Sequence, residues 1–169
     1  MIEAIKYSIA AILLAFLQAY LIQEINMGVW LKPLPYVAIF FVLNVHANRF
    51  VVLLAAFAFG FLIDLLSGSF GMHTGACVAL AFFKNLYDRN WLDIDSITLQ
   101  GQSYFSPEAK SWPAYLQYTG SLTFLHHLVF FSLDYFKADA LLYILLTASI
   151  STVGTLGISL LLRALFTSR

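Results

Sequence analysis

Charged residues are scarce in this sequence, and their scarcity excludes most soluble fold classes. Asp, Glu, Lys and Arg make up 11% of the 169 residues, 61% are hydrophobic, and the mean hydropathy is +0.83. Soluble domains carry about 25% charged residues. Three long stretches contain no charge at all, namely 7–23, 65–83 and 140–162. Because a bilayer core requires about 20 apolar helical residues, we expect an all-α, polytopic integral membrane protein.

The sequence also lacks cysteine pairs, a charge imbalance and enzyme motifs. Cys77 is the single cysteine, so neither an intrachain disulfide nor a Cys-based metal site is expected. Nine basic and nine acidic residues leave no excess of positive charge for a nucleic-acid partner. HExxH, GxSxG and P-loop motifs are missing, and no second intramembrane aspartate accompanies Asp64. These absences predict a protein without catalytic activity, metal or cofactor.

Six apolar segments indicate a single transmembrane domain over residues 1–169, with about six helices. The segments are 5–23, 34–47, 50–66, 71–87, 114–136 and 139–163. The second segment is short, because roughly 14 helical residues rise only about 21 Å. It is expected either to be re-entrant or to cross with a strong mismatch. Residues 88–113 form a polar loop within the domain.

The distribution of Lys and Arg predicts the orientation. Six crossings place seven of these residues on one side and two, Lys32 and Lys137, on the other. The positive-inside rule makes the richer side cytoplasmic, together with both termini and the polar loop. If the second segment does not cross, the N-terminus inverts and Lys32 exchanges sides with Lys6. All three tryptophans lie near predicted helix ends, where aromatic belts form: Trp30, Trp91 and Trp112.

The densest local signal is the stretch 60–75, Gly-Phe-Leu-Ile-Asp-Leu-Leu-Ser-Gly-Ser-Phe-Gly-Met-His-Thr-Gly. It predicts a helix end, a tight turn and a new helix start at the extracytoplasmic face. Asp64 and His73 each lie about one turn inside these helices and could meet across the turn. An ionisable residue at membrane depth favours a functional role. The alternative is that Asp64 fastens the hairpin by bonding to the free amides of residues 69–72.

Several residues in this hairpin and in the fifth segment are candidates for a cavity or a partner contact. They are Asp64, Ser67, Gly68, Gly71, His73, His126 and His127. Adjacent histidines on a helix point about 100 degrees apart, so His126 and His127 do not suit one metal ion. One of them is expected to face the bundle interior, either as a neutral ring bonded to a carbonyl or hydroxyl group or in a polar cavity.

Small residues recur every four positions in two helices, a spacing that lets helix backbones approach closely in lipid. One seam is Gly71, Gly75 and Ala79, and the other is Thr147, Ser151, Thr155 and Ser159. The sequence leaves open whether they pack within this chain or against the helix of another protein.

The 60–75 hairpin resembles the rod shape-determining protein MreD family. Its hydrophobic-Asp-hydrophobic-Leu-Ser-Gly core and following Gly-x-His are similar to that family, with residues 57–84 the most distinctive. Chain length, the six apolar segments, the polar connection, the His-His pair before Phe-rich sequence and the short basic C-terminus are similar too. The family is also similar in fold to the substrate-capturing subunits of energy-coupling-factor transporters, which implies a cavity near Asp64, His73 and the fifth helix.

The resemblance implies a non-catalytic subunit of the cell-elongation complex in the bacterial inner membrane. Such a subunit binds MreC, is linked with MreB, RodA and its penicillin-binding transpeptidase, and organises lateral peptidoglycan synthesis. Membrane lipids would be its other partners. Two other functions stay open: a small-molecule, vitamin-type transporter subunit, and a membrane enzyme for lipid-linked substrates with His126 or His127 as base. A bound substrate with an ATPase module would indicate the first, and activity of the isolated protein the second.

Overall fold

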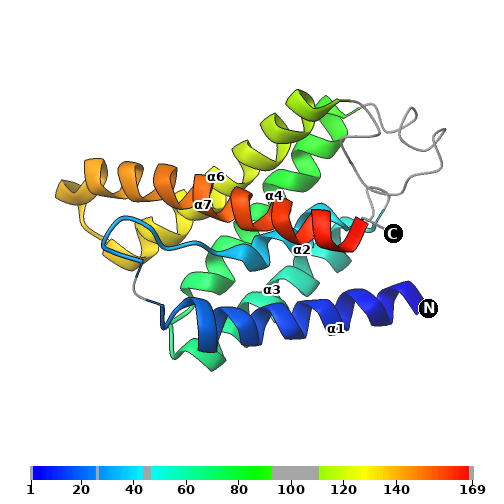
Figure 1. Cartoon of the computed structure of the whole chain (residues 1–169), viewed down its shortest axis with the longest axis horizontal. Coiled ribbons are helices and arrows are strands. Elements are labelled where there is room, and N and C mark those ends of the chain that lie inside the picture. The colour runs from blue at the N-terminus through cyan, green and yellow to red at the C-terminus, as the bar shows by residue number, and fades with distance from the viewer. Residues whose placement is uncertain (1, 26, 44–46, 93–110, 168–169) are drawn as a thin grey trace.

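The computed structural model describes residues 2–25, 27–43, 47–92 and 111–167, and every regular element in these ranges is helical (Figure 1). The longer helices are α1 (Ile2–Leu17), α3 (Arg49–Ser67), α4 (Met72–Trp91), α6 (Trp112–Tyr135) and α7 (Leu141–Thr167). The short elements are the π-helical η1 (Gln18–Ile22), η2 (Pro35–Val37), α2 (Ala38–Phe41) and η3 (Ala138–Ala140). The expected all-α class is confirmed for the described residues, and five of the six apolar segments form long helices.

Local sequence signals set several helix ends. Asn48 caps α3 by accepting a hydrogen bond from the backbone amide of Phe50 at 2.9 Å. Ser111 caps α6 in the same way, and the following Pro113 lies in the first turn, where a missing amide costs nothing. Gly68 ends α3 with a left-handed φ of 67°, which glycine adopts without steric cost.

The predicted polar loop is shorter than its expected bounds. α4 continues to Trp91 and α6 begins at Trp112, so both ends of the predicted range 88–113 are helical. Residues 93–110 lie outside the described residues.

The second apolar segment, 34–47, does not form one long helix. Among its described residues, 34–43 and 47, only η2 and α2 are helical, and their seven residues rise about 12 Å. Pro33 and Pro35 provide no backbone donors, and α7 supplies the partners that this irregular backbone needs. The amide of Leu34 donates to Thr155 Oγ1 at 2.9 Å. The segment is therefore an irregular element enclosed by protein, the setting in which such backbone is tolerated at membrane depth.

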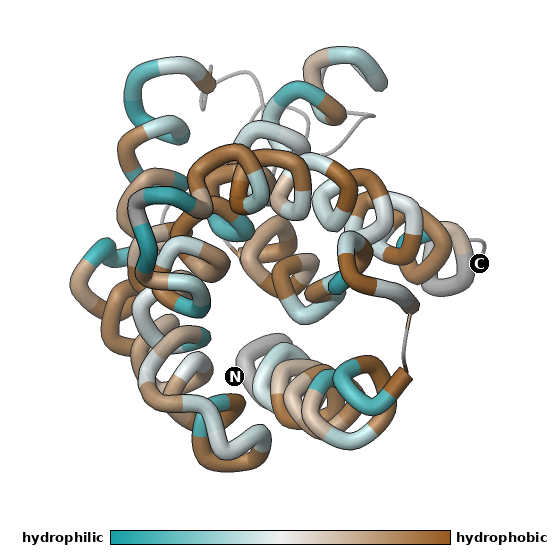
Figure 2. The backbone as a smooth tube through the Cα atoms, turned by 90° about the vertical axis from the view of Figure 1, so that its left-hand side faces the viewer, coloured by the Kyte–Doolittle hydropathy of each residue, from teal (hydrophilic) through white to brown (hydrophobic). Residues whose placement is uncertain are grey.

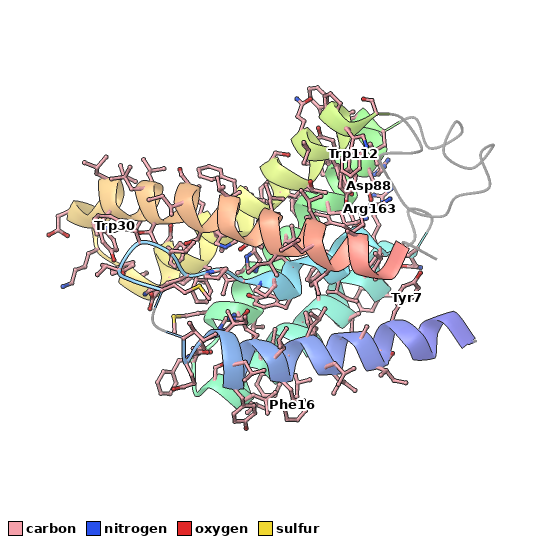
Figure 3. The ribbon with its side chains drawn as sticks, viewed as in Figure 1. Tyr7, Phe16, Trp30, Asp88, Trp112 and Arg163 are labelled. Carbon is pink, nitrogen blue, oxygen red and sulfur yellow. The ribbon has the colours of Figure 1, made fainter. Side chains whose placement is uncertain are left out.

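The chain reverses direction at each connection, and the segment 29–41 runs alongside α7 (Figure 1). Tyr7, Asp88, Trp112 and Arg163 lie toward one end of the molecule, and Trp30 lies at the other (Figure 3). Fully buried side chains gather between α3, α4, α6 and the 34–41 segment: Tyr36, Phe40, Ile63, Leu80 and Phe131.

Two of the described helices are long and apolar enough to cross a membrane. They are Arg49–Ser67, with 19 residues, and Leu141–Ala164, with 24. A third of an 18-residue apolar window in each is buried inside the chain, and large apolar side chains along both helices are exposed. Hydrophobic residues run along all the long helices in Figure 2.

α3 lies very close to the backbone of the first turn of α4 at Gly60. A Cβ atom on Gly60 would lie 2.6 Å from Thr74 Cα and 2.8 Å from the carbonyl oxygen of His73. Only glycine permits this contact, which brings the end of α3 over the N-terminus of α4. The contact thereby positions Asp64, one turn further along α3.

Candidate functional site

Asp64 joins α3 to the N-terminus of α4 and is 4% exposed. Its Oδ1 accepts hydrogen bonds from Ser69 Oγ at 2.6 Å and from the backbone amide of His73 at 3.0 Å. Its Oδ2 accepts from the amide of Thr74 at 2.9 Å and from Thr74 Oγ1 at 2.5 Å. The carboxylate thus satisfies two amides that an α-helix leaves free at its N-terminus, where negative charge is also favourable.

Asp64 therefore fastens the hairpin, as one of the two sequence interpretations expected, but through different donors. The amides that it binds belong to His73 and Thr74, rather than to residues 69–72. The expected contact between Asp64 and His73 is made by the backbone amide of His73. The imidazole ring of His73 contacts the hydroxyl of Tyr36 instead. The reason is that Gly71, with φ of 81°, delays the start of α4 until Met72.

The other hairpin candidates have different environments. Ser67 is half-buried, and its Oγ has no partner in the described part of the chain. Gly71 is exposed, and nothing lies within 4 Å of the position of a Cβ atom there. Gly75 packs against α6, because a Cβ would lie 2.9 Å from Leu133 Cδ1. Of the predicted seam Gly71, Gly75 and Ala79, Gly75 makes a close interhelical contact within the chain and Gly71 does not.

Tyr36 connects two histidines from different helices in the core. Its hydroxyl lies 2.8 Å from His73 Nδ1 and 3.1 Å from His126 Nε2, and all three side chains are at most 3% exposed. A tyrosine hydroxyl has one proton, so it donates to one ring and accepts from the other. The protonation patterns of the two rings are consequently linked. His126 Nδ1 has no partner among the described residues.

His127 belongs to a second network, on the side of α6 that faces α7. Its Nδ1 lies 2.8 Å from the carbonyl oxygen of Thr123, so this nitrogen carries the proton. Its Nε2 lies 3.1 Å from Thr155 Oγ1, which also accepts from the amide of Leu34. In a neutral ring Nε2 accepts the hydroxyl proton, so every described contact has a matched donor and acceptor. Both paired histidines are thus buried, whereas the sequence predicted one.

The second predicted seam, on α7, packs within the chain. Thr147, Ser151 and Thr155 are fully buried, and Ser159 is half-buried. Ser151 Oγ accepts from the amide of Lys32 at 3.0 Å, one turn away from the bond between Thr155 and Leu34. Ser151 and Thr155 thus provide the hydrogen bonds that hold the irregular 30–34 backbone, a role that a spacing of four residues did not reveal.

A buried ion pair within α4 is bonded to α6 through Tyr118, near the other end of the molecule (Figure 3), and the sequence did not indicate it as a site. Lys84 Nζ lies 2.6 Å from Asp88 Oδ2, and Lys84 is 2% exposed. Tyr118 donates to Asp88 Oδ1 at 2.7 Å. The i, i+4 spacing of Lys84 and Asp88 was the available signal. It could not show burial, because most such pairs lie in solvent.

A cavity of about 420 Å³ opens at the end of the molecule where Trp30 lies. It is bounded by η1, the 22–34 connection, the α3–α4 turn and the end of α6. Its polar lining comprises Gln18, Gln23, Glu24, Lys32, Ser69, His73 and Asp134. The hydrogen-bonded series His73, Tyr36 and His126 therefore begins at the cavity wall. Of the predicted candidates, only His73 lines this cavity.

The arrangement of the histidines does not form a metal site. The rings of His126 and His127 are inclined by 76° and contact different partners. Within the described ranges, no three His, Cys, Asp or Glu residues lie close enough to hold an ion. These histidines can form hydrogen bonds with hydroxyl groups, as they do with Tyr36 and Thr155.

Replacing Tyr36 by phenylalanine is expected to lower the free energy of unfolding by about 1–3 kcal/mol, because His73 and His126 would each lose a buried partner. Thermal unfolding in detergent measures the change. Tyr143→Phe is the matched control, since the hydroxyl of Tyr143 is near the surface and bonds to Tyr135 and to the carbonyl of Val29. Equal losses in the two variants would contradict a special role for the Tyr36 contact.

Comparison with protein-family models, with curated proteins and with solved structures gives no match, so the function has to be inferred from the residues of this chain.

Proposed function

We propose that this chain is a multi-pass membrane protein that acts as a non-catalytic subunit of the bacterial cell-elongation complex. The membrane part of the proposal is supported by the outer face of α3. Its side chains are 49–74% exposed: Phe50, Leu54, Phe57, Phe61 and Leu65. A contiguous apolar face of this kind is unfavourable in water, and lipid tails remove the cost.

Six passes are supported by the path of the chain. The long helices alternate in direction (Figure 1). The 29–41 segment makes the remaining pass, as irregular backbone followed by the short helices η2 and α2. This path places Tyr7 and Arg163 at the same end (Figure 3). With the excess of Lys and Arg at that end, both termini are cytoplasmic and the 60–75 hairpin faces the other side. The bacterial inner membrane is the location that this topology fits.

The subunit role rests on the hairpin that resembles MreD. Its aspartate is occupied with folding, because both oxygens of Asp64 accept two hydrogen bonds each. The tip instead presents Phe70, whose side chain is 97% exposed. A large aromatic ring at the tip of a rigid turn is suited to fill a pocket of another protein. This is the single observation on which the proposal of a docking subunit for MreC depends.

The test is purification of the tagged protein from its own membrane in mild detergent, with quantitative mass spectrometry of the proteins that accompany it. Recovery of MreC together with RodA and its transpeptidase is the expected result. The cavity favours a second candidate function, a small-molecule transporter subunit. Recovery of an ATPase module in place of MreC would support that function and overturn the first.

Phe70→Ala is expected to reduce the recovery of MreC at least roughly tenfold, the cost of one interface anchor, without changing the yield of folded protein. Phe136→Ala is the matched control. Phe136 is 86% exposed and follows the end of α6, one of the elements that bound the cavity at this end of the molecule. Undiminished recovery with Phe70→Ala, or an equal loss with Phe136→Ala, would argue against the hairpin tip as the contact.

A further inference from the structure

We propose that the cavity beside η1 binds a small amphipathic molecule that carries a primary ammonium group. The inference rests on neither of the functions above and applies to a scaffold and to a transporter subunit alike. Its volume of about 420 Å³ lies in the range of small-molecule sites.

The first argument is the state of Gln18. Its side chain lines the cavity and is 2% exposed, and its Oε1 has no hydrogen-bond donor in the described part of the chain. Buried side-chain oxygens are almost always bonded, so this one indicates a missing donor. Gln18 also begins the π-helical η1, and short π-helical turns are frequent at functional sites.

The second argument is charge. The described lining includes two carboxylates, Glu24 and Asp134, and one ammonium, Lys32. Lys32 Nζ is already engaged, 3.7 Å from Asp134 Oδ2 and 5.6 Å from the centre of the Tyr135 ring. Glu24 forms no ion pair within the described residues. The unused groups are therefore an amide oxygen and a carboxylate, both acceptors, and a cationic donor complements both.

The third argument is the nature of the remaining walls. Apolar side chains from four elements of the chain complete the cavity, among them Ile22, Leu34, Met72 and Phe130. They suit an apolar body attached to the charged head. A free alkyl or aryl amine and the aminoethyl headgroup of a membrane lipid both have this chemistry.

Binding can be followed by fluorescence of the full-length protein in nanodiscs of phosphatidylglycerol. Trp91→Phe and Trp112→Phe leave Trp30, next to the cavity-lining Leu31, as the sole tryptophan. The probes are n-hexylammonium, hexanol and hexanoate, which share one apolar body. We expect hexylammonium to bind at least roughly tenfold more tightly than the other two, since a hydrogen bond to a charged group contributes that much. Equal affinities would overturn the proposal.

Two substitutions in this single-tryptophan protein locate the binding. Gln18→Leu and Glu24→Gln should each weaken hexylammonium binding roughly tenfold, because each removes one of the two unused acceptors. Gln117→Leu and Asp139→Asn, which remove an amide and a carboxylate charge at exposed positions outside the cavity, should not. Gln18→Leu removes an unpartnered buried oxygen, so its melting temperature should not fall, and weaker binding would not reflect unfolding. Affinities in Gln18→Leu equal to those of the parent protein would overturn the site.

Nanodiscs that contain phosphatidylethanolamine distinguish the two sources of the amine. If the lipid is the ligand, the hexylammonium response disappears, and native mass spectrometry finds phosphatidylethanolamine on the parent protein but not on Gln18→Leu. If a free amine is the ligand, the response persists in these nanodiscs. Either result supports the ammonium site.

Discussion

Gly60→Ala is expected to destabilise the protein by about 3 kcal/mol, at the upper end of the usual cost of overpacking. The added methyl group would lie 2.6–2.9 Å from three backbone atoms of His73 and Thr74. Backbone cannot rotate away as a side chain can, so α3 and α4 must separate. Thermal unfolding in detergent, with the fraction of monodisperse protein, measures the effect.

Gly157→Ala is the matched control for this substitution. Gly157 lies in α7, is exposed and has nothing within 4 Å of a Cβ position. There the change should stabilise the helix by up to about 1 kcal/mol, the difference in helix propensity. If Gly60→Ala were as stable as Gly157→Ala, the close crossing of α3 and α4 would be disproved.

Asp64→Ala is expected to lower the free energy of unfolding by at least about 3 kcal/mol. The change leaves the amides of His73 and Thr74 and the hydroxyl of Ser69 without their acceptor. Each unsatisfied buried group costs about 1–3 kcal/mol, and the favourable charge at the start of α4 is lost as well. Chemical unfolding measured by circular dichroism gives the loss.

Asp64→Asn is the informative comparison. The asparagine side chain keeps one acceptor oxygen, but its NH2 group would face two hydrogen-bond donors that the second carboxylate oxygen now accepts from. Its stability should lie between those of the parent protein and Asp64→Ala. If Asp64 were chiefly a ligand-binding group, both substitutions would leave stability unchanged. The Gln18→Leu substitution separates these roles, since it removes a cavity contact without touching the hairpin.

Gly60→Ala and Asp64→Ala both test the same structural unit, the contact between α3 and the first turn of α4. Gly60 allows α3 to lie against the first turn of α4, and Asp64 then bonds to that turn. Met72 and His73 of that turn and Ser69 of the preceding connection line the cavity. Loss of the crossing should therefore also impair binding of hexylammonium, whereas loss of binding in Gln18→Leu leaves the crossing intact.

The long helices, the ends of α3 and the 60–75 hairpin follow from the sequence alone. Long uncharged stretches predicted the long helices, Asn48 and Gly68 mark both ends of α3, and the motif at 60–75 predicted the hairpin. Fastening of the hairpin was one of the two interpretations of Asp64. These features depend on hydropathy, capping and turn preferences, which act between residues close together in the chain.

Tertiary structure decided the rest. The contact of Tyr36 with His73 spans 37 residues, and the bond that holds the irregular backbone at Leu34 to Thr155 spans 121. The unpartnered oxygen of Gln18 and the cavity beside it exist only once η1, the α3–α4 turn and α6 have packed together. No periodicity encodes such contacts, because partners so distant in the chain are brought together by the packing of whole helices and not by local preference.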